Sequence, residues 1–328
     1  MHRDKKNGLS KKEWFLILLG LPMTGALAMS VSSAPDSLSK IYQGTFSSAT
    51  TGARSLKLLS WNIERGLQRA GIEAAIEREK PEICILQEVD LNAERTGRQN
   101  VAAELAQMFQ LNYVFGVEFQ ELGQESRGSP AYHGQAVLTA LPIRSSYILR
   151  FVNQSNFWQP HWYLPNWRAF QRRLGGRMAL VAEIEAGGAT LVVYNVHLES
   201  REHESLRLSQ LDEILEDLKR YRPGIPLILA GDFNTKAHDS PVVRRIGEAG
   251  FRNALGNETA ATNVKGASID WIFVRGPIRF ENGKVHHEIV ASDHYPISVS
   301  IHPLEKTENL TPTGLETPPR GFFGKESQ

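Results

Sequence analysis

The sequence predicts an α/β protein with mixed β-sheets. Short apolar runs typical of strands alternate with three longer stretches whose apolar residues have helical spacing. One pair of runs is separated by Gly187-Gly188, which indicates a hairpin and therefore antiparallel pairing inside a sheet. Strands with helices at intervals and hairpins among them are typical of mixed sheets. At 328 residues and 41% hydrophobic content, the chain can bury a large core.

Four strands and two helices are expected in the first half of the folded part. The strands are predicted at 56–63, 83–86, 113–117 and 134–139. A helix is predicted from about residue 70 to residue 79, because Pro81 disfavours its continuation. Apolar residues at positions 101, 105, 108 and 109 form a stripe that predicts a second helix over 99–109.

The second half contains five further expected strands and one helix. The strands are predicted at 178–185, 190–197, 227–230, 269–274 and 297–301. Leu208, Leu211, Leu215 and Leu218 recur on one face of a helix predicted over 204–221. These elements alternate along the chain without any detectable internal repeat.

The N-terminus has the composition of an export signal. Basic residues end at Lys12, an apolar stretch follows at 14–21, and Ala26-Leu27-Ala28 has the small-x-small pattern that signal peptidases favour. The sixteen residues 14–29 are fewer than the roughly 20 that a spanning helix needs. Residues 1–29 are therefore expected to be a cleaved signal or an uncleaved membrane anchor through 13–29, with a buried helix as a third alternative. Either exported form places the remainder outside the cytoplasm, in a periplasmic or extracellular location.

The rest of the chain divides by composition. Residues 30–54 are rich in Ser, Thr, Ala and Gly and are expected to be a flexible linker. Residues 304–328 are expected to be a flexible tail, and 55–303 a single catalytic domain. The single cysteine, Cys84, excludes an intramolecular disulfide framework and any multi-cysteine zinc site. The net charge of +1 argues against a wholly basic protein that coats nucleic acid.

Polar side chains lie at the ends or starts of six strands that are predicted to be buried. The segments are SWNIE (60–64), LQEVD (86–90), NVHL (195–198), GDFNT (231–235), IDWIF (269–273) and SDHYP (292–296). Each segment alone would be read as a turn or cap, because buried polar groups are costly unless paired. Together they predict one pocket of carboxylate, amide and imidazole groups. Hard oxygen ligands of this kind favour Mg²⁺, or Mn²⁺, over zinc.

In this order, the segments resemble the endonuclease/exonuclease/phosphatase superfamily of metal-dependent phosphoesterases. The resemblance covers residues 56–301, which is essentially the whole folded part. It implies a four-layer α/β/β/α sandwich with two packed mixed β-sheets. It also implies a hydrolase that cleaves phosphodiester bonds by metal- and histidine-assisted attack of water.

The resemblance implies four residues around the metal. Glu88 would be the principal ligand, and Asn62 and Glu64 would support the metal and the phosphate. Asp293 matches an acid that positions the metal or a water molecule.

Five further residues are implied in catalysis. Asp232 and Asn234 match the pair that orients the attacking water, and His294 matches the catalytic histidine with Asp270 as its partner. His197 matches a second histidine found in deoxyribonucleases and sphingomyelinases, whereas apurinic endonucleases have a tyrosine there. A carboxylate beside an imidazole fixes its tautomer and raises its basicity. Which histidine acts as base stays open.

Several residues are candidates for contacts with substrate phosphate. Gln135 stands where the family often has asparagine, and Arg177 opens a strand beside two glycines. Arg168, Arg172 and Arg173 belong to a stretch, 126–182, that has seven arginines and no acidic residue.

The remaining histidines are expected to lie at the surface. His133 is interpreted as a surface group. The others expected to be solvated are His161, His203, His238, His286, His287 and His302.

Substrate class is left open by the motifs. Aromatic residues are interleaved with the arginines, and three of the six tryptophans (158, 162 and 167) lie within ten residues. Such a surface suits nucleic acid through phosphate contacts and base stacking, and it also suits a lipid interface. Alternatively the aromatic side chains fill a local core. Nucleic acid is favoured, with a sphingomyelinase-like or small-molecule phosphoesterase as the alternative and a non-catalytic binding module as a third.

Overall fold

The computed structural model describes residues 36–48, 55–126, 128–155, 157, 161, 163–201, 203–235, 239–256 and 260–303. The chain divides into two compact units, Met1–Ser33 and Ala34–Gln328, and every described residue lies in the second. The expected signal or anchor at 1–29 and the expected tail at 304–328 lie outside the described residues. Among the residues described, no helix is long and apolar enough to cross a membrane.

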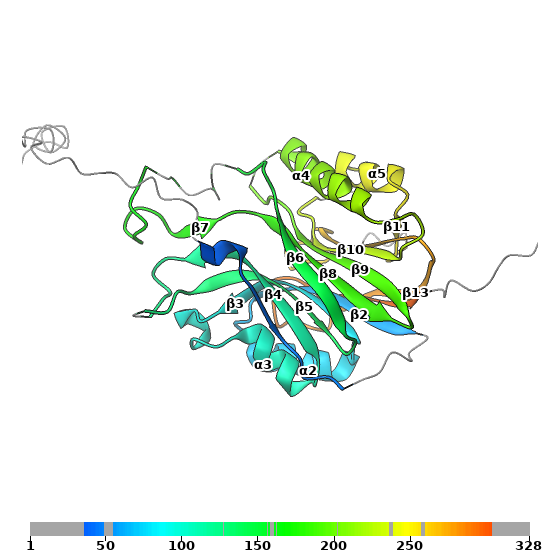
Figure 1. Cartoon of the computed structure of the whole chain (residues 1–328), viewed down its shortest axis with the longest axis horizontal. Helices are drawn as coiled ribbons and strands as arrows, with labels where there is room; N and C mark the ends of the chain where they lie inside the picture. Colours follow the sequence, from blue (N-terminus) through cyan, green and yellow to red (C-terminus); the bar gives the residue numbers. More distant parts are fainter. Residues whose placement is uncertain are drawn as a thin grey trace, which may run out of the picture. The chain divides into compact units, whose positions relative to one another are not determined.

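One mixed sheet forms the lower layer of strands in Figure 1. Its strands are β1 (Ile41–Gly44), β2 (Leu56–Arg65), β3 (Ile83–Leu91), β4 (Asn112–Glu121), β5 (Tyr132–Thr139), β7 (Arg173–Gly175), β13 (Ile278–Val285) and β14 (Ile297–Pro303). Their order is β1-β4-β5-β3-β2-β14-β13, and β7 pairs with β4. Only β2 and β3 run parallel among these pairs in the described chain, so their carboxyl ends meet at one edge.

A second mixed sheet packs on the first. Its strands are β6 (Ile143–Arg150), β8 (Met178–Ala186), β9 (Ala189–His197), β10 (Leu227–Asp232), β11 (Arg252–Asn253) and β12 (Asp270–Arg275). The order is β11-β12-β10-β9-β8-β6, with β9 and β10 parallel. Gly187 (φ 57°) and Gly188 (φ 81°) form the predicted hairpin turn between β8 and β9. Two consecutive residues with positive φ are what a tight two-residue hairpin turn requires.

Helices cover the outer face of each sheet, as Figure 1 shows. The helices are α2 (Arg69–Glu79), α3 (Val101–Met108), α4 (Glu204–Asp217) and α5 (Pro241–Glu248), with short 3₁₀ segments η1 (Asp36–Ser39), η2 (Glu94–Thr96) and η3 (Leu218–Arg220). Helices α2 and α3 pack on the first sheet, and α4 and α5 pack on the second.

Three hydrophobic clusters correspond to the three interfaces between these layers. The central cluster joins the sheets, with Leu58 and Ile85 from one and Val193 and Ile228 from the other. A second cluster packs α2 and α3 on their sheet, and a third packs α4 and α5 on theirs. Burial of this apolar surface is the main source of stability. The predicted four-layer sandwich with two packed mixed sheets is confirmed.

Part of the segment expected to be a linker is ordered structure. Within residues 30–54, Leu38 is buried and β1 pairs antiparallel with β4. Tyr42 on β1 packs against the rings of Phe115 and Tyr132. The prediction of a linker is therefore wrong for residues 36–44, because the composition of the whole segment obscured one short edge strand.

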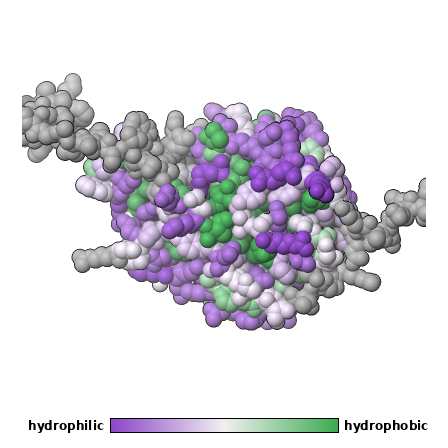
Figure 2. All heavy atoms as spheres, in the orientation of Figure 1, coloured by the Kyte–Doolittle hydropathy of each residue, from purple (hydrophilic) through white to green (hydrophobic). Residues whose placement is uncertain are grey.

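Hydrophilic side chains cover most of the face seen in Figure 2, and hydrophobic ones gather near its middle, over the strands. The large exposed hydrophobic side chains include a group within one stretch that connects β6 to β7: Val152, Phe157, Tyr163, Trp167 and Phe170. Exposure of this many apolar side chains in one segment is unusual for a surface without a binding partner.

Candidate active site

Parallel pairing brings the predicted site residues to the carboxyl ends of four strands. In the first sheet, β2 carries Asn62 and β3 carries Glu88. In the second sheet, Asp232 at the end of β10 lies in register with His197 of β9 on one side and Asp270 of β12 on the other. The fold thus brings Asn62 into contact with Asp232, 170 positions away in the sequence.

Asn62 links the two sheets at this edge. Its Nδ2 lies 3.4 Å from Glu88 Oε1 and donates over 3.3 Å to Asp232 Oδ2. Its Oδ1 accepts the backbone N–H of Glu64. Asn62 therefore contacts the Glu88 carboxylate through its amide nitrogen. Its side-chain oxygen accepts a hydrogen bond within the turn that follows.

Three of the predicted site residues have strained backbone conformations. Glu64 (φ 45°), Glu88 (φ 51°) and Asn234 (φ 51°) all adopt left-handed conformations that side chains other than glycine rarely take. At Glu88, the pairing of β3 shifts between residues 86 and 89, which is a β-bulge. Bulges turn a side chain out of the ladder, so this irregularity directs Glu88 away from its neighbours in the strand.

His294 and Asp270 form the predicted pair. His294 Nδ1 lies 2.9 Å from Asp270 Oδ2, and its Nε2 lies 3.8 Å from Asp232 Oδ2. Thr262 Oγ1 donates to Asp270, and the indole N–H of Trp61 donates to the backbone carbonyl of His294. Burial lowers the pKa of His294, but Asp270, Asp232 and a further acid outweigh this and raise it to about 10.

His197 faces the same carboxylate from the other side. Its Nε2 lies 3.6 Å from Asp232 Oδ2, and its Nδ1 lies 3.8 Å from Glu118 Oε2. Glu118 is fully buried and forms a 2.6 Å ion pair with the buried Arg177. Burial and the positive charge of Arg177 hold the pKa of His197 well below its usual value. The two imidazoles of the site thus have opposite pKa shifts.

Glu118 is a site residue that the sequence did not reveal. It lies within β4 at a second bulge, where the pairing with β5 shifts between residues 117 and 119. An acid in the middle of the largely apolar strand 112–121 was the available signal, since a buried carboxylate must be paired. Its partners, Arg177 and His197, are 59 and 79 positions away along the chain.

Negative charge dominates the centre of the site. Burial and the neighbouring Asp270 raise the pKa of Asp232 to about 7, despite the opposing effect of His294. Burial would also raise the pKa of Glu88, but the surrounding cations, led by His133 and Arg65, hold it below its usual value. Asp232, Asp270 and His294 each place one potential ligand atom within 4.8 Å of the others.

Asn234 and Asp293 complete the edge of the site. Asn234 donates its backbone N–H to Asp232 Oδ1 and its amide to the Leu198 carbonyl. Asp293 is partly exposed, and its Oδ1 lies 3.5 Å from Ser292 Oγ, which donates to the backbone carbonyl of Asn62.

The predicted phosphate contact of Gln135 is not supported by its position. Gln135 is fully buried in β5, and its amide donates over 2.9 Å to the Met178 carbonyl of β8. This hydrogen bond joins the two sheets, as does the bond between Gln87 and Asn195. Gln135 is therefore a bridge inside the sandwich rather than an accessible phosphate ligand.

The predicted arginines have three different environments. Arg177 is buried in the ion pair with Glu118. Arg173 forms a 3.0 Å ion pair with Glu121 and stacks over the Phe119 ring. Arg168 and Arg172 are exposed, and these two retain the accessible charge that the prediction requires. Trp158 and Trp162 lie outside the described residues.

Two histidines expected at the surface are buried. His133 is 3% exposed, and its Nδ1 lies 3.2 Å from Asp90 Oδ1. His286 is 1% exposed, and its ring contacts Ser298, Glu79 and Glu288. Both expectations failed because the acidic partners come from other strands or helices. His238 lies outside the described residues.

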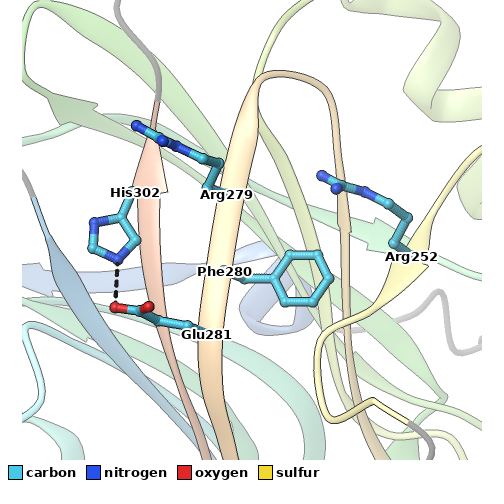
Figure 3. A pocket seen from close by; sticks show the side chains of 5 residues that line it. All are labelled: Arg252, Arg279, Phe280, Glu281 and His302. Carbon is cyan, nitrogen blue, oxygen red and sulfur yellow. Dashed lines mark hydrogen bonds and ion pairs between the residues drawn. The ribbon is translucent and has the colours of Figure 1, made fainter.

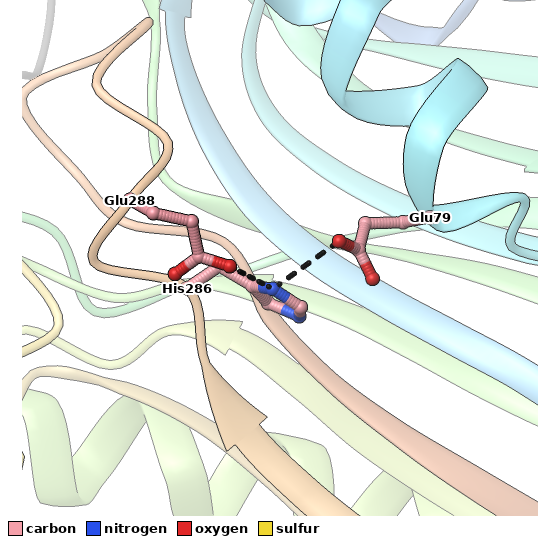
Figure 4. Close-up of side chains that lie close together, drawn as sticks. All are labelled: Glu79, His286 and Glu288. Atoms are coloured by element: carbon pink, nitrogen blue, oxygen red, sulfur yellow. Dashed lines mark hydrogen bonds and ion pairs between the residues drawn. The ribbon is translucent and has the colours of Figure 1, made fainter.

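The cluster around His286 lies near the start of β2, away from the site (Figure 4). The carboxylates of Glu79 and Glu288 both point toward His286 Nδ1, at 3.4 and 3.3 Å. The same carboxylates are neutralised by three cations, Lys57, Arg78 and Lys284. With more positive than negative charge around it, this cluster is an ion-pair network that ties α2 to the first sheet.

A surface pocket of about 460 Å³ is lined by residues of β11, β13 and β14 (Figure 3). The lining residues are Arg252, Arg279, Phe280, Glu281 and His302. Arg252 lies over the Phe280 ring and donates to the Ile278 carbonyl, while His302 pairs with Glu281. The pocket contains none of the predicted site residues.

Several solved structures share this fold at low sequence identity. An endonuclease/exonuclease/phosphatase protein from Beutenbergia cavernae is 19% identical, with a TM-score of 0.56 over 76% of this chain and 72% of its own. The human Nocturnin catalytic domain is 16% identical, with a TM-score of 0.58 over 77% and 96%. A humanised D. rerio TDP2 is 19% identical, with a TM-score of 0.52 over 76% and 99%. A search of curated proteins found no match.

A family model matches residues 59–294, which is more than half of the chain and includes every predicted catalytic and metal-binding residue. This match agrees with the fold and with the convergence of the predicted site residues at one edge of the two sheets. The chain belongs to the endonuclease/exonuclease/phosphatase family.

Proposed function

We propose that the protein is an exported, Mg²⁺-dependent phosphodiesterase that acts on nucleic acid. One observation carries the proposal: two buried imidazoles, His197 and His294, face the same oxygen of Asp232 at 3.6 and 3.8 Å. Asn62 connects that carboxylate to Glu88. This arrangement has the groups needed to orient water, move a proton and hold a divalent cation beside a phosphate ester.

The chemistry of the residues fits a hard divalent cation. Burial and Asp270 raise the pKa of Asp232, so a cation bound beside it would stabilise the ionised carboxylate. Glu88 and Asp293 would hold the cation, with Glu64 and Asn62 beside them. A bound Mg²⁺ would offset the charge of the phosphate and stabilise the leaving oxygen.

Asp232 and the two histidines beside it would position the attacking water and transfer protons. Asp232, held by the backbone N–H of Asn234, is placed to orient the attacking water. Asp270 fixes His294 so that its Nε2 faces the centre of the site. Glu118 places its charge beside His197, with 3.8 Å between its Oε2 and Nδ1 of the ring. One imidazole can take a proton from water while the other supplies one to the leaving oxygen, so the net reaction adds water across the P–O bond.

Exposed arginines support nucleic acid as the substrate. Arg168 and Arg172 lie in a stretch, 126–182, without acidic residues, and Trp167 and Phe170 are 67% and 50% exposed beside them. Positive charge attracts the phosphate backbone, and exposed rings stack with bases.

The experiment replaces Arg168 and Arg172 with Gln in the full chain. We expect KM for DNA or RNA to rise and its salt dependence to flatten, since fewer counterions are released on binding. The rate on a small aryl phosphodiester should not change. A matched control replaces the exposed Arg222 and Arg279 with Gln. An unchanged salt slope in the first variant would contradict nucleic acid as the substrate.

A second candidate function is supported by the same exposed rings. Tyr163, Trp167 and Phe170 are each at least half exposed, and aromatic residues of this kind bind at membrane interfaces. Replacing Trp167 and Phe170 with Ser would abolish hydrolysis of sphingomyelin vesicles and spare soluble substrates if the protein acts on lipid. Equal losses on all substrates, with a lowered Tm, would show that the rings only pack the segment.

Export rests on the N-terminal sequence. The order of basic, apolar and small residues in 1–29 supports a signal or an anchor through 13–29. We propose a periplasmic or extracellular location, with membrane attachment if the segment stays uncleaved.

A further inference from the structure

His133 lies between two irregularities of the first sheet. It is on β5, opposite Asp90 of β3 and Phe119 of β4. Both neighbouring strands bulge just before these partners, at Glu88 and at Glu118. The bulges turn two acids out of the ladder. These are Glu88, the predicted metal ligand, and Glu118, the partner of His197. His133 therefore stands between two residues of the candidate active site.

Asp90 fixes the orientation of the His133 ring. Asp90 is fully buried, and Arg95 donates two hydrogen bonds to its carboxylate, at 2.7 and 2.8 Å. The ion pair with Arg95 compensates for the burial of this carboxylate. An ionised carboxylate only accepts hydrogen bonds, so His133 Nδ1, at 3.2 Å, carries the hydrogen. Phe119 stacks on the ring, with 6.1 Å between centroids.

This arrangement leaves the opposite nitrogen available. Within the described part of the chain, Nε2 of His133 has no hydrogen-bond partner. It is also not fully enclosed by protein atoms. The ring also acts on the site electrostatically. His133 contributes to the lowered pKa of His197.

We propose that His133 is a third imidazole of the active site and that, as an imidazolium with bound substrate, it donates from Nε2–H to an oxygen of the substrate's phosphate group. Asp90 and Arg95 are the positioning residues that aim it. This inference rests on the proposed phosphodiesterase function and adds a substrate-binding residue to it. The orienting pair, Asp90 and His133, repeats the arrangement of Asp270 and His294 on the opposite sheet.

Two substitutions separate binding from a structural role. In His133→Asn, the amide nitrogen can take the place of Nδ1 and keep the bond to Asp90, but nothing replaces Nε2. In His133→Gln, the longer side chain can place its amide where Nε2 stood. A purely structural role predicts that Asn is the better replacement, whereas a substrate contact predicts that Gln is better.

The assay uses the full chain with Mg²⁺ and two probes, inorganic phosphate and a small aryl phosphodiester. In His133→Asn, we expect the Kd for phosphate by calorimetry and the KM for the ester to rise about ten- to hundredfold, the loss typical of a hydrogen bond to a charged group. The Tm and kcat should change less. In His133→Gln, both constants should return to within a few-fold of wild type.

The proposal is overturned if the Asn variant binds phosphate as wild type does, or if the Gln variant binds no better than the Asn variant. If either variant does not fold, ¹⁵N NMR of the imidazoles in the wild-type protein provides the test. Phosphate should then shift the Nε2 resonance of His133, and an unmoved resonance would refute the contact. Absence of EDTA-sensitive hydrolysis in wild type would instead refute the proposed function, because phosphate binding is measured without turnover.

Discussion

Asp270→Asn tests the ion pair at the centre of the site. The pKa of His294 rises from 6.5 to about 10 in the folded protein, which corresponds to about 5 kcal/mol in favour of the imidazolium. Asp270 shares this effect with Asp232 and Asp293. Asparagine still accepts the hydrogen bond from Thr262 but carries no charge. We therefore expect the free energy of unfolding at pH 7 to fall by about 2–4 kcal/mol.

The pH dependence of this loss has a definite sign. A folded-state pKa above the unfolded value gives stability that is fully present below pH 6.5 and is lost as the pH rises through about 10. The difference between wild type and Asp270→Asn should therefore be largest near pH 6 and shrink toward pH 10. Activity should fall as well, because the variant cannot stabilise a charged His294.

The assay is urea unfolding from pH 6 to pH 10 in EDTA, so that no bound metal contributes. Asp212→Asn is the matched control, because its side chain is 49% exposed and its pair with Arg245 is a surface ion pair. It should change the stability by less than about 1 kcal/mol. A pH-independent difference, or wild-type stability and rates in Asp270→Asn, would refute the assignment.

Three further predictions concern the buried ion pair, the strand packing and the location. Arg177→Met should destabilise the fold by about 3–5 kcal/mol, because Glu118 loses its charge partner, and adding Glu118→Gln should restore part of this in urea unfolding. Gly134→Ala should lower the Tm strongly, since its Cβ would lie 2.0 Å from the Gly116 carbonyl oxygen, whereas Gly247→Ala meets nothing within 4 Å and should be neutral or stabilising. Mass spectrometry of the exported protein should find an N-terminus near residue 29 if the signal is cleaved. An intact Met1 on a soluble cytoplasmic protein would contradict both the signal and the anchor.

Sequence periodicity predicted the strands that carry the site and located their ends within a few residues. Buried parallel strands such as β9 and β10 are continuous apolar runs that end in polar residues, so their limits were visible. The expected strand 83–86 proved to be longer, Ile83–Leu91, because its polar residues remain in the ladder around a bulge. The long helix expected over 204–221 ends in a 3₁₀ turn.

Elements with weaker patterns were missed. Strand β13 has alternating exposed residues and an irregular pairing between Glu281 and Lys284, so it has no continuous apolar face. Helix α5 is short, although Ser240 caps its N-terminus and Pro241 occupies its first turn, which is a recognisable start signal. The edge strand β6 is only partly buried and has no clear polar alternation.

Site residues that lie at the ends of apolar strands were predicted from the sequence. Site residues whose burial depends on long-range contacts were missed. His197, Asp232 and His294 follow apolar runs and were expected to converge. Glu118 and His133 are single polar residues whose partners are tens of positions away. The bulges and the pairing of β3, β4 and β5 bring His133 to Asp90, and the packing of the two sheets brings Arg177 and His197 to Glu118. A sequence alone specifies neither.

The most direct test of the account is the rate at which the purified full chain hydrolyses a small aryl phosphodiester with Mg²⁺ and with EDTA. The account predicts hydrolysis that EDTA abolishes and excess Mg²⁺ restores. It also predicts that Glu88→Gln lowers the rate by orders of magnitude at nearly unchanged Tm, because the side chain is partly exposed and serves the site rather than the core. Hydrolysis that continues in excess EDTA, or a wild-type rate in Glu88→Gln, would contradict a metal-dependent site at this edge of the sheets.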